Sequence, residues 1–139
     1  MKSRTLGLFA LPLLAASLVQ AAPPPYVSVD HSTETLLDKA TAKAMWQDAL
    51  PARLAKLYPP KKWGFVSEVE GGFNAAKTCI ITARAMMMPL RGKLLTFSPA
   101  KTATAIDALP NATSEQCKEL ARAKLKEAIS AVVGGLVAS

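Results

Sequence analysis

The sequence predicts an α+β fold: an N-terminal helix broken at Pro51, an antiparallel sheet of three to four strands, and a C-terminal helix packed on the sheet and tied to it by one disulfide. Two observations carry this prediction. The run Lys77–Met88 alternates between apolar and mixed positions, as a strand with one face on the core does. The two cysteines of the chain lie in this run, at Cys79, and at the start of the most helix-like segment, at Cys117.

Cys79 lies on the apolar side of the alternation, with Ile81, Ala83, Ala85 and Met87. A disulfide needs Cα atoms within about 7 Å of each other, and a helix packed on this side of the strand would bring Cys117 into reach. An exported chain with two cysteines usually joins them. We therefore predict a Cys79–Cys117 disulfide, with two free thiols as the alternative.

The first 21 residues have the features of a secretory signal peptide. Lys2 and Arg4 precede an apolar run from Leu6 to Val19, and Ala21 is a small residue suited to the cleavage site. The apolar run is shorter than the roughly 20 residues that span a bilayer, so an uncleaved anchor is the weaker alternative. Cleavage after Ala21 predicts a periplasmic or secreted bacterial protein with no transmembrane span.

Three further segments complete the predicted organisation. Residues 22–31 contain three consecutive prolines and are expected to form a proline-rich tether. Residues 32–135 are expected to form one α+β domain, and residues 136–139 a tail.

The first helix is expected to begin near Ser32 or Asp30 as its cap, because helical apolar spacing follows as far as Leu50. Pro51 interrupts this pattern and suits the first turn of a second short helix that ends at Tyr58. Strands are expected at 62–70, 77–88 and 94–98, with a weaker candidate at 102–108 that could also be loop.

Glycines mark the predicted turns and the last helix end. Gly71-Gly72-Phe73-Asn74 and Arg91-Gly92 are expected to be turns between strands. Thr113 and Gln116 have the spacing of a capping box, so a helix is expected from Ser114 to Val133, ended by Gly134-Gly135.

The residue inventory makes catalysis and metal binding weak hypotheses. His31 is the single histidine, which leaves little material for Ser-His-Asp or Cys-His chemistry. Met86 and Met88 would face away from Met87 in a strand, and no histidine accompanies them, so we expect no metal and no cofactor. The enzyme alternative is a small hydrolase that runs on carboxylates, with Glu68 and Glu70 as the acidic pair and Arg84 as an anion holder.

The second side of the central strand is the candidate partner-binding face. It carries Ile80, Arg84, Met86 and Met88. In one arrangement the N-terminal helices cover this side and its side chains are core. In the other, all helices lie on the Cys79 side, and the exposed Ile and Met side chains around an arginine suit a protein partner or self-association.

A second candidate is an anion patch on the last helix. Lys118, Arg122 and Lys126 recur every four residues and share one helix face, although acidic residues interleave with them. The formal net charge of the chain is +7, which favours acidic partners or anionic surfaces. This charge alone does not indicate nucleic-acid binding, and none is expected.

Three segments in order resemble a known domain. Lys77–Cys79 opens a strand, Gly92–Leu95 follows, and Cys117–Ala121 opens an alanine-rich helix. Over residues 77–125 this resembles the periplasmic C-terminal domain of TolA, which similarly ties a strand to a helix by one disulfide. The resemblance implies envelope docking rather than catalysis. The chain departs from it in an apparent insertion at 101–111, in the extra strand at Trp63 and in lacking a long helical stalk before the domain.

The sequence therefore predicts an exported, non-catalytic binding protein whose partner is another envelope protein. Small domains of this build serve as inhibitors, immunity proteins, adaptors or solute-binding proteins. The alternatives are a TolA-like docking domain and the carboxylate-based hydrolase.

Overall fold

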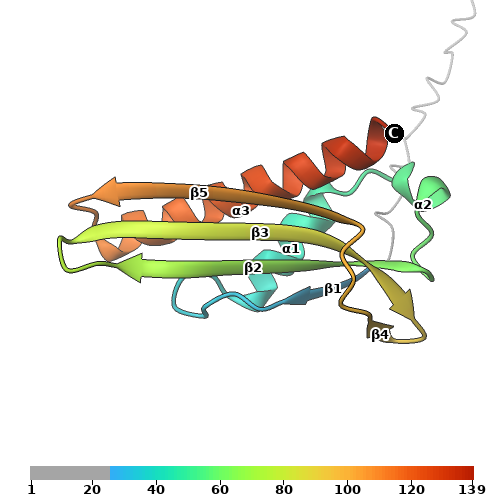
Figure 1. Ribbon diagram of the computed structural model, residues 1–139, viewed down its shortest axis with the longest axis horizontal. Helices are drawn as coiled ribbons and strands as arrows, with labels where there is room; N and C mark the ends of the chain where they lie inside the picture. Colours follow the sequence, from blue (N-terminus) through green and yellow to red (C-terminus); the bar gives the residue numbers. More distant parts are fainter. Residues whose placement is uncertain (1–25) are drawn as a thin grey trace, which may run out of the picture.

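A computed structural model describes residues 26–139, in which one five-stranded sheet carries two helices on one face (Figure 1). The α+β prediction is confirmed. The elements in order are β1 (Val27–Asp30), α1 (Lys39–Ala49), α2 (Leu54–Leu57), β2 (Trp63–Phe73), β3 (Thr78–Arg91), β4 (Leu94–Leu95), β5 (Lys101–Pro110) and α3 (Ser114–Val137). The sheet runs β1-β2-β3-β5, and β4 pairs with the far end of β3. The predicted break at Pro51 separates α1 from α2.

β3 is the centre of the sheet, since β2, β4 and β5 all pair with it. Its apolar positions face the helices and are buried, as the alternation predicted: Cys79, Ile81, Ala83, Ala85 and Met87. α3 packs against β3 and β5, and α1 supplies Trp46, whose ring lies 4.7 Å from that of Phe65 on β2. The main core is therefore the layer between the sheet and these two helices.

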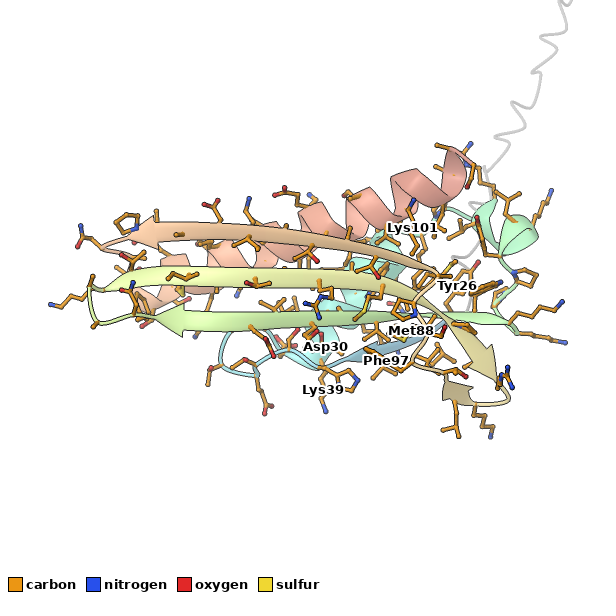
Figure 2. All side chains as sticks on the ribbon, in the orientation of Figure 1. Tyr26, Asp30, Lys39, Met88, Phe97 and Lys101 are labelled. Carbon is orange, nitrogen blue, oxygen red and sulfur yellow. A yellow bond between two sulfur atoms is a disulfide. The ribbon has the colours of Figure 1, made fainter. Side chains whose placement is uncertain are left out.

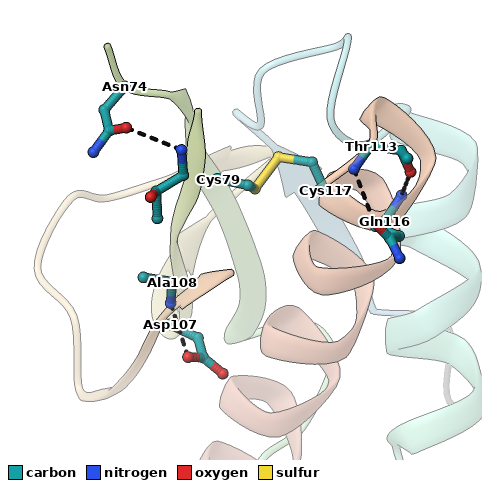
Figure 3. The surroundings of a disulfide bond; sticks show 8 residues. Asn74, Cys79, Asp107, Ala108, Thr113, Gln116 and Cys117 are labelled. Atoms are coloured by element: carbon teal, nitrogen blue, oxygen red, sulfur yellow. Dashed lines mark hydrogen bonds between the residues drawn. A yellow bond between two sulfur atoms is a disulfide. The ribbon is translucent and has the colours of Figure 1, made fainter. Parts of the chain in front are cut away.

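The Cys79–Cys117 disulfide joins the middle strand to the first turn of α3 (Figure 3). The two Cα atoms lie 5.7 Å apart and both cysteines are buried. The predicted pairing is confirmed.

The capping box at the start of α3 is also confirmed (Figure 3). The Gln116 N–H donates to Thr113 Oγ1 at 3.1 Å, and the Thr113 N–H donates to Gln116 Oε1 at 2.8 Å. We expect Thr113→Ala to lower the free energy of unfolding by about 1 kcal/mol, because it removes a hydrogen-bond acceptor for a free helix N–H. Urea denaturation measures this. Thr113→Ser keeps the hydroxyl and should stay close to the native value; an equal loss in both variants would contradict the capping role.

The tether predicted for residues 22–31 is wrong in its second half. Val27–Asp30 form β1, which runs parallel to β2, so the sheet is mixed rather than wholly antiparallel. After β1 ends at Asp30, the chain stays hydrogen-bonded to β2: the Thr33 N–H donates to the Val69 carbonyl at 2.9 Å. The predicted signal peptide and the prolines of the tether lie outside the described residues.

The predicted cap of the first helix is wrong for a related reason. The Asp30 carboxylate accepts a bond from the Ser67 hydroxyl at 2.7 Å, and the Ser32 hydroxyl accepts one from the Val69 N–H at 2.9 Å. These side chains hold the chain against β2 and are not available to a helix start. α1 begins at Lys39 instead, with Asp38 as its cap. Hydrogen bonds from the side chain and the N–H of Thr41 lower the pKa of Asp38.

The structure corrects the roles predicted for two glycine pairs. Gly71-Gly72 lie inside β2, and the turn begins at Asn74, whose Oδ1 accepts bonds from the N–H groups of Ala76 and Thr78. Gly134-Gly135 do not end α3, which continues to Val137 because Leu136 is buried against the core. The first two residues of the tail predicted at 136–139 are therefore helical.

The last two strands also differ from the prediction. The strand predicted at 94–98 is a two-residue bridge, Leu94–Leu95. The weaker candidate at 102–108 is a full ten-residue strand along the edge of the sheet.

Candidate functional site

No helix of residues 26–139 covers the face of the sheet opposite α1 and α3 (Figure 1). We call it the open face. The arrangement in which the N-terminal helices cover this side is wrong, since Trp46 of α1 packs in the core on the Cys79 side. Ile80 and Arg84 are exposed on the open face, and Ile106, opposite Thr82 in the β3–β5 register, is 67% exposed. Half of the predicted partner face is therefore accessible to solvent.

The other half of that predicted face is buried by a segment that sequence reasoning did not place there. Met86 and Met88 form a small second core with Val66, and Leu95 packs against it. After β3 the chain turns back, and residues 93–97 fold over this end of the open face, where Figure 2 shows Phe97 beside Met88.

A groove of about 420 Å³ lies between this folded-back segment and β1. Its floor and walls are mainly apolar, and it is lined by Val27, Val29, His31, Val66, Glu68, Arg84, Met86, Met88, Lys93, Leu94, Leu95 and Phe97. Met86 and Met88 form the floor, with only 3% and 2% of their surface exposed. Leu94 and Phe97 stand at the rim and are 76% and 80% exposed. Exposed apolar side chains that join a contiguous apolar surface, as these two do at the groove, mark a surface that can bind a partner.

Gly64 on β2 allows the two walls of the groove, Leu95 and β1, to lie close to the strand between them. A Cβ at this position would lie 2.5 Å from Leu95 Cδ2 and 2.8 Å from the Val27 carbonyl oxygen. The missing side chain lets Leu95 from one side and β1 from the other approach the backbone of β2. The position of the groove therefore depends on a glycine that has no role in a turn.

One ion pair on the open face forms part of the groove lining. Arg84 Nη1 lies 3.2 Å from Glu68 Oε2, and both side chains are partly exposed to water. Arg84, expected as an anion holder in the hydrolase alternative, is thus paired with one of the two carboxylates of that alternative. Glu70 lies on the same side of β2 but outside the groove. Lys93 and His31 complete the polar rim of the groove.

The predicted anion patch lies on α3, away from the groove. The Lys118 ammonium is 3.2 Å from Glu115 Oε1, and Arg122 and Lys126 are exposed. A fourth basic residue of this helix, Lys124, joins α3 to β5 through a contact with Asp107 at 3.3 Å. It also contacts Glu127 of the same helix at 2.7 Å. The anion patch stays a prediction.

The same contacts shift two pKa values. A hydrogen bond from the Ala108 N–H, followed by the contact with Lys124, lowers the pKa of Asp107. Hydrogen bonds to Glu127 and Asp107 raise the pKa of Lys124. Both groups keep their charges at neutral pH, so this link between helix and edge strand is present there.

Two sets of groove residues were missed from the sequence. Val27 and Val29 fall in the predicted tether, and their alternation with Ser28 and Asp30 was the available signal for a strand. Leu95 and Phe97 fall in the strand predicted at 94–98, and the groove that they line was not predicted. The short Arg91-Gly92 turn was the signal that this run folds back over Met88.

Within residues 26–139, no group of three or more histidine, cysteine, aspartate or glutamate side chains could hold a metal ion. No helix in this part of the chain has the length and apolar character needed to cross a membrane. The intrachain disulfide is compatible with a periplasmic or secreted protein.

By its fold the chain is a small α+β protein with a helix-covered sheet and one open face. No family model matches the sequence, and no curated protein matches it. Among solved structures, it is similar to two forms of the PelC dodecamer from Paraburkholderia phytofirmans. One form, which carries a single substitution, has 11% identity and a TM-score of 0.47 over 81% of this chain and 90% of that chain. The other has 13% identity and a TM-score of 0.43 over 84% and 89%. Likeness at this level assigns neither a family nor a function to this chain.

Proposed function

We propose that this protein is an exported binding protein whose groove holds an apolar, extended segment of another envelope protein. The observation that carries the proposal is the pairing of a preformed apolar floor, Met86 and Met88, with the highly exposed rim residues Leu94 and Phe97. Methionine adapts its shape to the side chain that it meets, and aromatic residues are enriched at protein interfaces.

The shape of the groove favours a peptide segment over a compact ligand. It lies open along the face between β1 and the 93–97 segment, and sheet continues beyond it toward Ile80. A bound segment could therefore extend from the groove across the open face. Buried apolar contacts would supply affinity, and the polar rim would fix orientation.

The charges around the groove favour acidic residues beside the apolar anchor of the partner. Lys93 stands at the rim and Arg91 is exposed next to it, whereas Glu68 is already paired with Arg84. The positive net charge of the whole chain would speed the encounter with such a partner at low ionic strength. A docking role of this kind is also what the resemblance to the TolA domain implies.

The test is the double variant Leu94→Asp with Phe97→Asp, used as bait against envelope extract beside the native protein. Loss of both large apolar side chains at the rim should weaken capture of a stoichiometric partner by about 100-fold or more. Both side chains are exposed, so the fold and the thermal midpoint should stay near native values.

Leu57→Asp is the matched control, because Leu57 is an exposed leucine on α2 outside the groove. It should capture the partner as the native protein does. Equal capture by the native chain and the double variant would overturn the groove as the binding site. A purified protein with hydrolase activity that is abolished by Glu68→Ala with Glu70→Ala would overturn the binding role itself.

A further inference from the structure

The outer edge of β5 is a second unused surface, separate from the groove. Within the described chain β5 pairs with β3 alone, and Figure 1 shows it along the border of the sheet. The border strand on the opposite side, β1, has four residues, whereas β5 has ten. Natural proteins usually protect a long edge with charges, proline or a bulge, because its free backbone groups can pair with another strand.

The register identifies which backbone groups are free. The Leu90 N–H donates to the Lys62 carbonyl at 2.8 Å, so the even-numbered residues of β3 direct their backbone groups toward β2. The odd-numbered residues of β3 then face β5, where they pair with odd-numbered residues such as Ala103 and Ala105. The even-numbered residues of β5 must direct their N–H and C=O groups to the outer edge.

One end of this edge is closed by the protein itself. The Ala108 N–H donates to Asp107 Oδ1 at 2.8 Å (Figure 3), and Pro110 has no N–H to offer. The open part therefore consists of Thr102, Thr104 and Ile106, and its midpoint is Thr104. An antiparallel strand of the same sequence, related by a twofold axis at Thr104, would pair with all three.

The side chains fit this register. It places Thr104 opposite Thr104 of the second copy, and Thr102 opposite Ile106. It also places Lys101 opposite Asp107 on the side of the sheet that α3 covers. Opposite charges at directly facing positions stabilise a pair of strands. The Asp107 carboxylate has two oxygens, so it can bind Lys101 of the second copy and keep its contact with Lys124. A shift by two residues would put Lys101 opposite Ala105 or Leu109, without a charge partner.

We propose that two copies of this chain form a twofold dimer in which their β5 strands pair antiparallel around Thr104 and join the two sheets. The interface is isologous, so the assembly closes at two copies. Ile106, 67% exposed in one copy, becomes partly covered by Thr102 of the other. No residue of β5 lines the groove, so each copy keeps its groove free for the partner.

The test is disulfide trapping with the purified full chain. In Thr104→Cys the two introduced thiols would face each other with Cα atoms about 5.5 Å apart, within disulfide range. Mild oxidation should give a dimer on non-reducing gels. In Thr102→Cys, the same substitution two positions away, the thiols of the two copies would be about 13 Å apart. That variant should give at least about tenfold less dimer, because two thiols have a high effective concentration for each other only where the interface holds them close together.

A mixture of Thr102→Cys and Ile106→Cys chains should form the mixed dimer, because these positions face each other in the same register. Light scattering of the native protein over a concentration series should show a dimer as the largest species. Equal trapping at positions 102 and 104, or a monomer at every concentration, would overturn the proposal. Since β5 is outside the groove, Thr104→Cys should still capture the partner, so failure of the dimer and failure of the groove are separate results.

Discussion

Removal of the Cys79–Cys117 bridge should lower the free energy of unfolding by about 4 kcal/mol, the chain-entropy value for a loop of this length. The two cysteines are 38 residues apart in sequence, and the bridge closes a loop that contains most of β3 and all of β5. Without it, the unfolded chain gains the conformations that the loop now forbids. For a domain of this size, the loss corresponds to a thermal midpoint lower by about 15 °C.

The measurement is thermal and urea unfolding of Cys79→Ala with Cys117→Ala. Both positions are buried, so alanine avoids placing a hydroxyl in the core. The matched control is the native protein under reducing conditions, where the cross-link is lost and both sulfur atoms remain. Its midpoint should fall nearly as far as that of the double variant. A native protein whose midpoint does not move on complete reduction would show that the bridge contributes no stability.

The part of the fold that was predicted correctly depends on patterns within one segment or on one covalent constraint. The alternation in β3 identified the buried side of the strand, and the disulfide placed α3 on that side. The capping box of α3 is likewise a local signal, complete within four residues. The alternation and the capping box are determined by neighbours in sequence, and the disulfide could be predicted because the chain has just two cysteines, so one sequence suffices to find all three.

The errors depend on contacts between segments far apart in the chain. Asp30 and Ser32 are residue types that suit a helix cap. In the structure their side chains instead bind Ser67 and Val69 on β2, which the sequence near them does not indicate. β1 is parallel to its neighbour, and its partner lies more than thirty residues away. A short strand with so distant a partner carries little signal of its own. The groove was missed because β1 forms one of its walls.

The candidate face was found in part for the same reason. The alternation placed Ile80, Arg84, Met86 and Met88 together on one side of β3, and the structure does the same. It did not show that residues 93–97 would cover the two methionines and leave the isoleucine and the arginine exposed. That outcome depends on Gly64, because Leu95 occupies the space that a side chain at this position would fill.

Gly71 is the glycine at which an added methyl group should lower the stability of the fold most. It lies within β2 rather than in the predicted turn, with φ of +137°, opposite Ile81 of β3. A Cβ there would lie 1.9 Å from the Ile80 carbonyl oxygen, which belongs to the backbone and cannot rotate away. We expect Gly71→Ala to lower the free energy of unfolding by about 3 to 5 kcal/mol, as the sum of backbone strain and overpacking.

Gly72→Ala separates these two contributions. Gly72 has a similar backbone, with φ of +147°, but a Cβ there would have no atom within 4 Å. This variant should lose only the strain, about 1 to 3 kcal/mol. Urea denaturation of both variants measures the difference, which is the cost of forcing β2 away from β3 at the end of the sheet held by the disulfide. Equal losses in the two variants would mean that the strands can separate freely there, and would contradict the close pairing of β2 with β3 around Ile80.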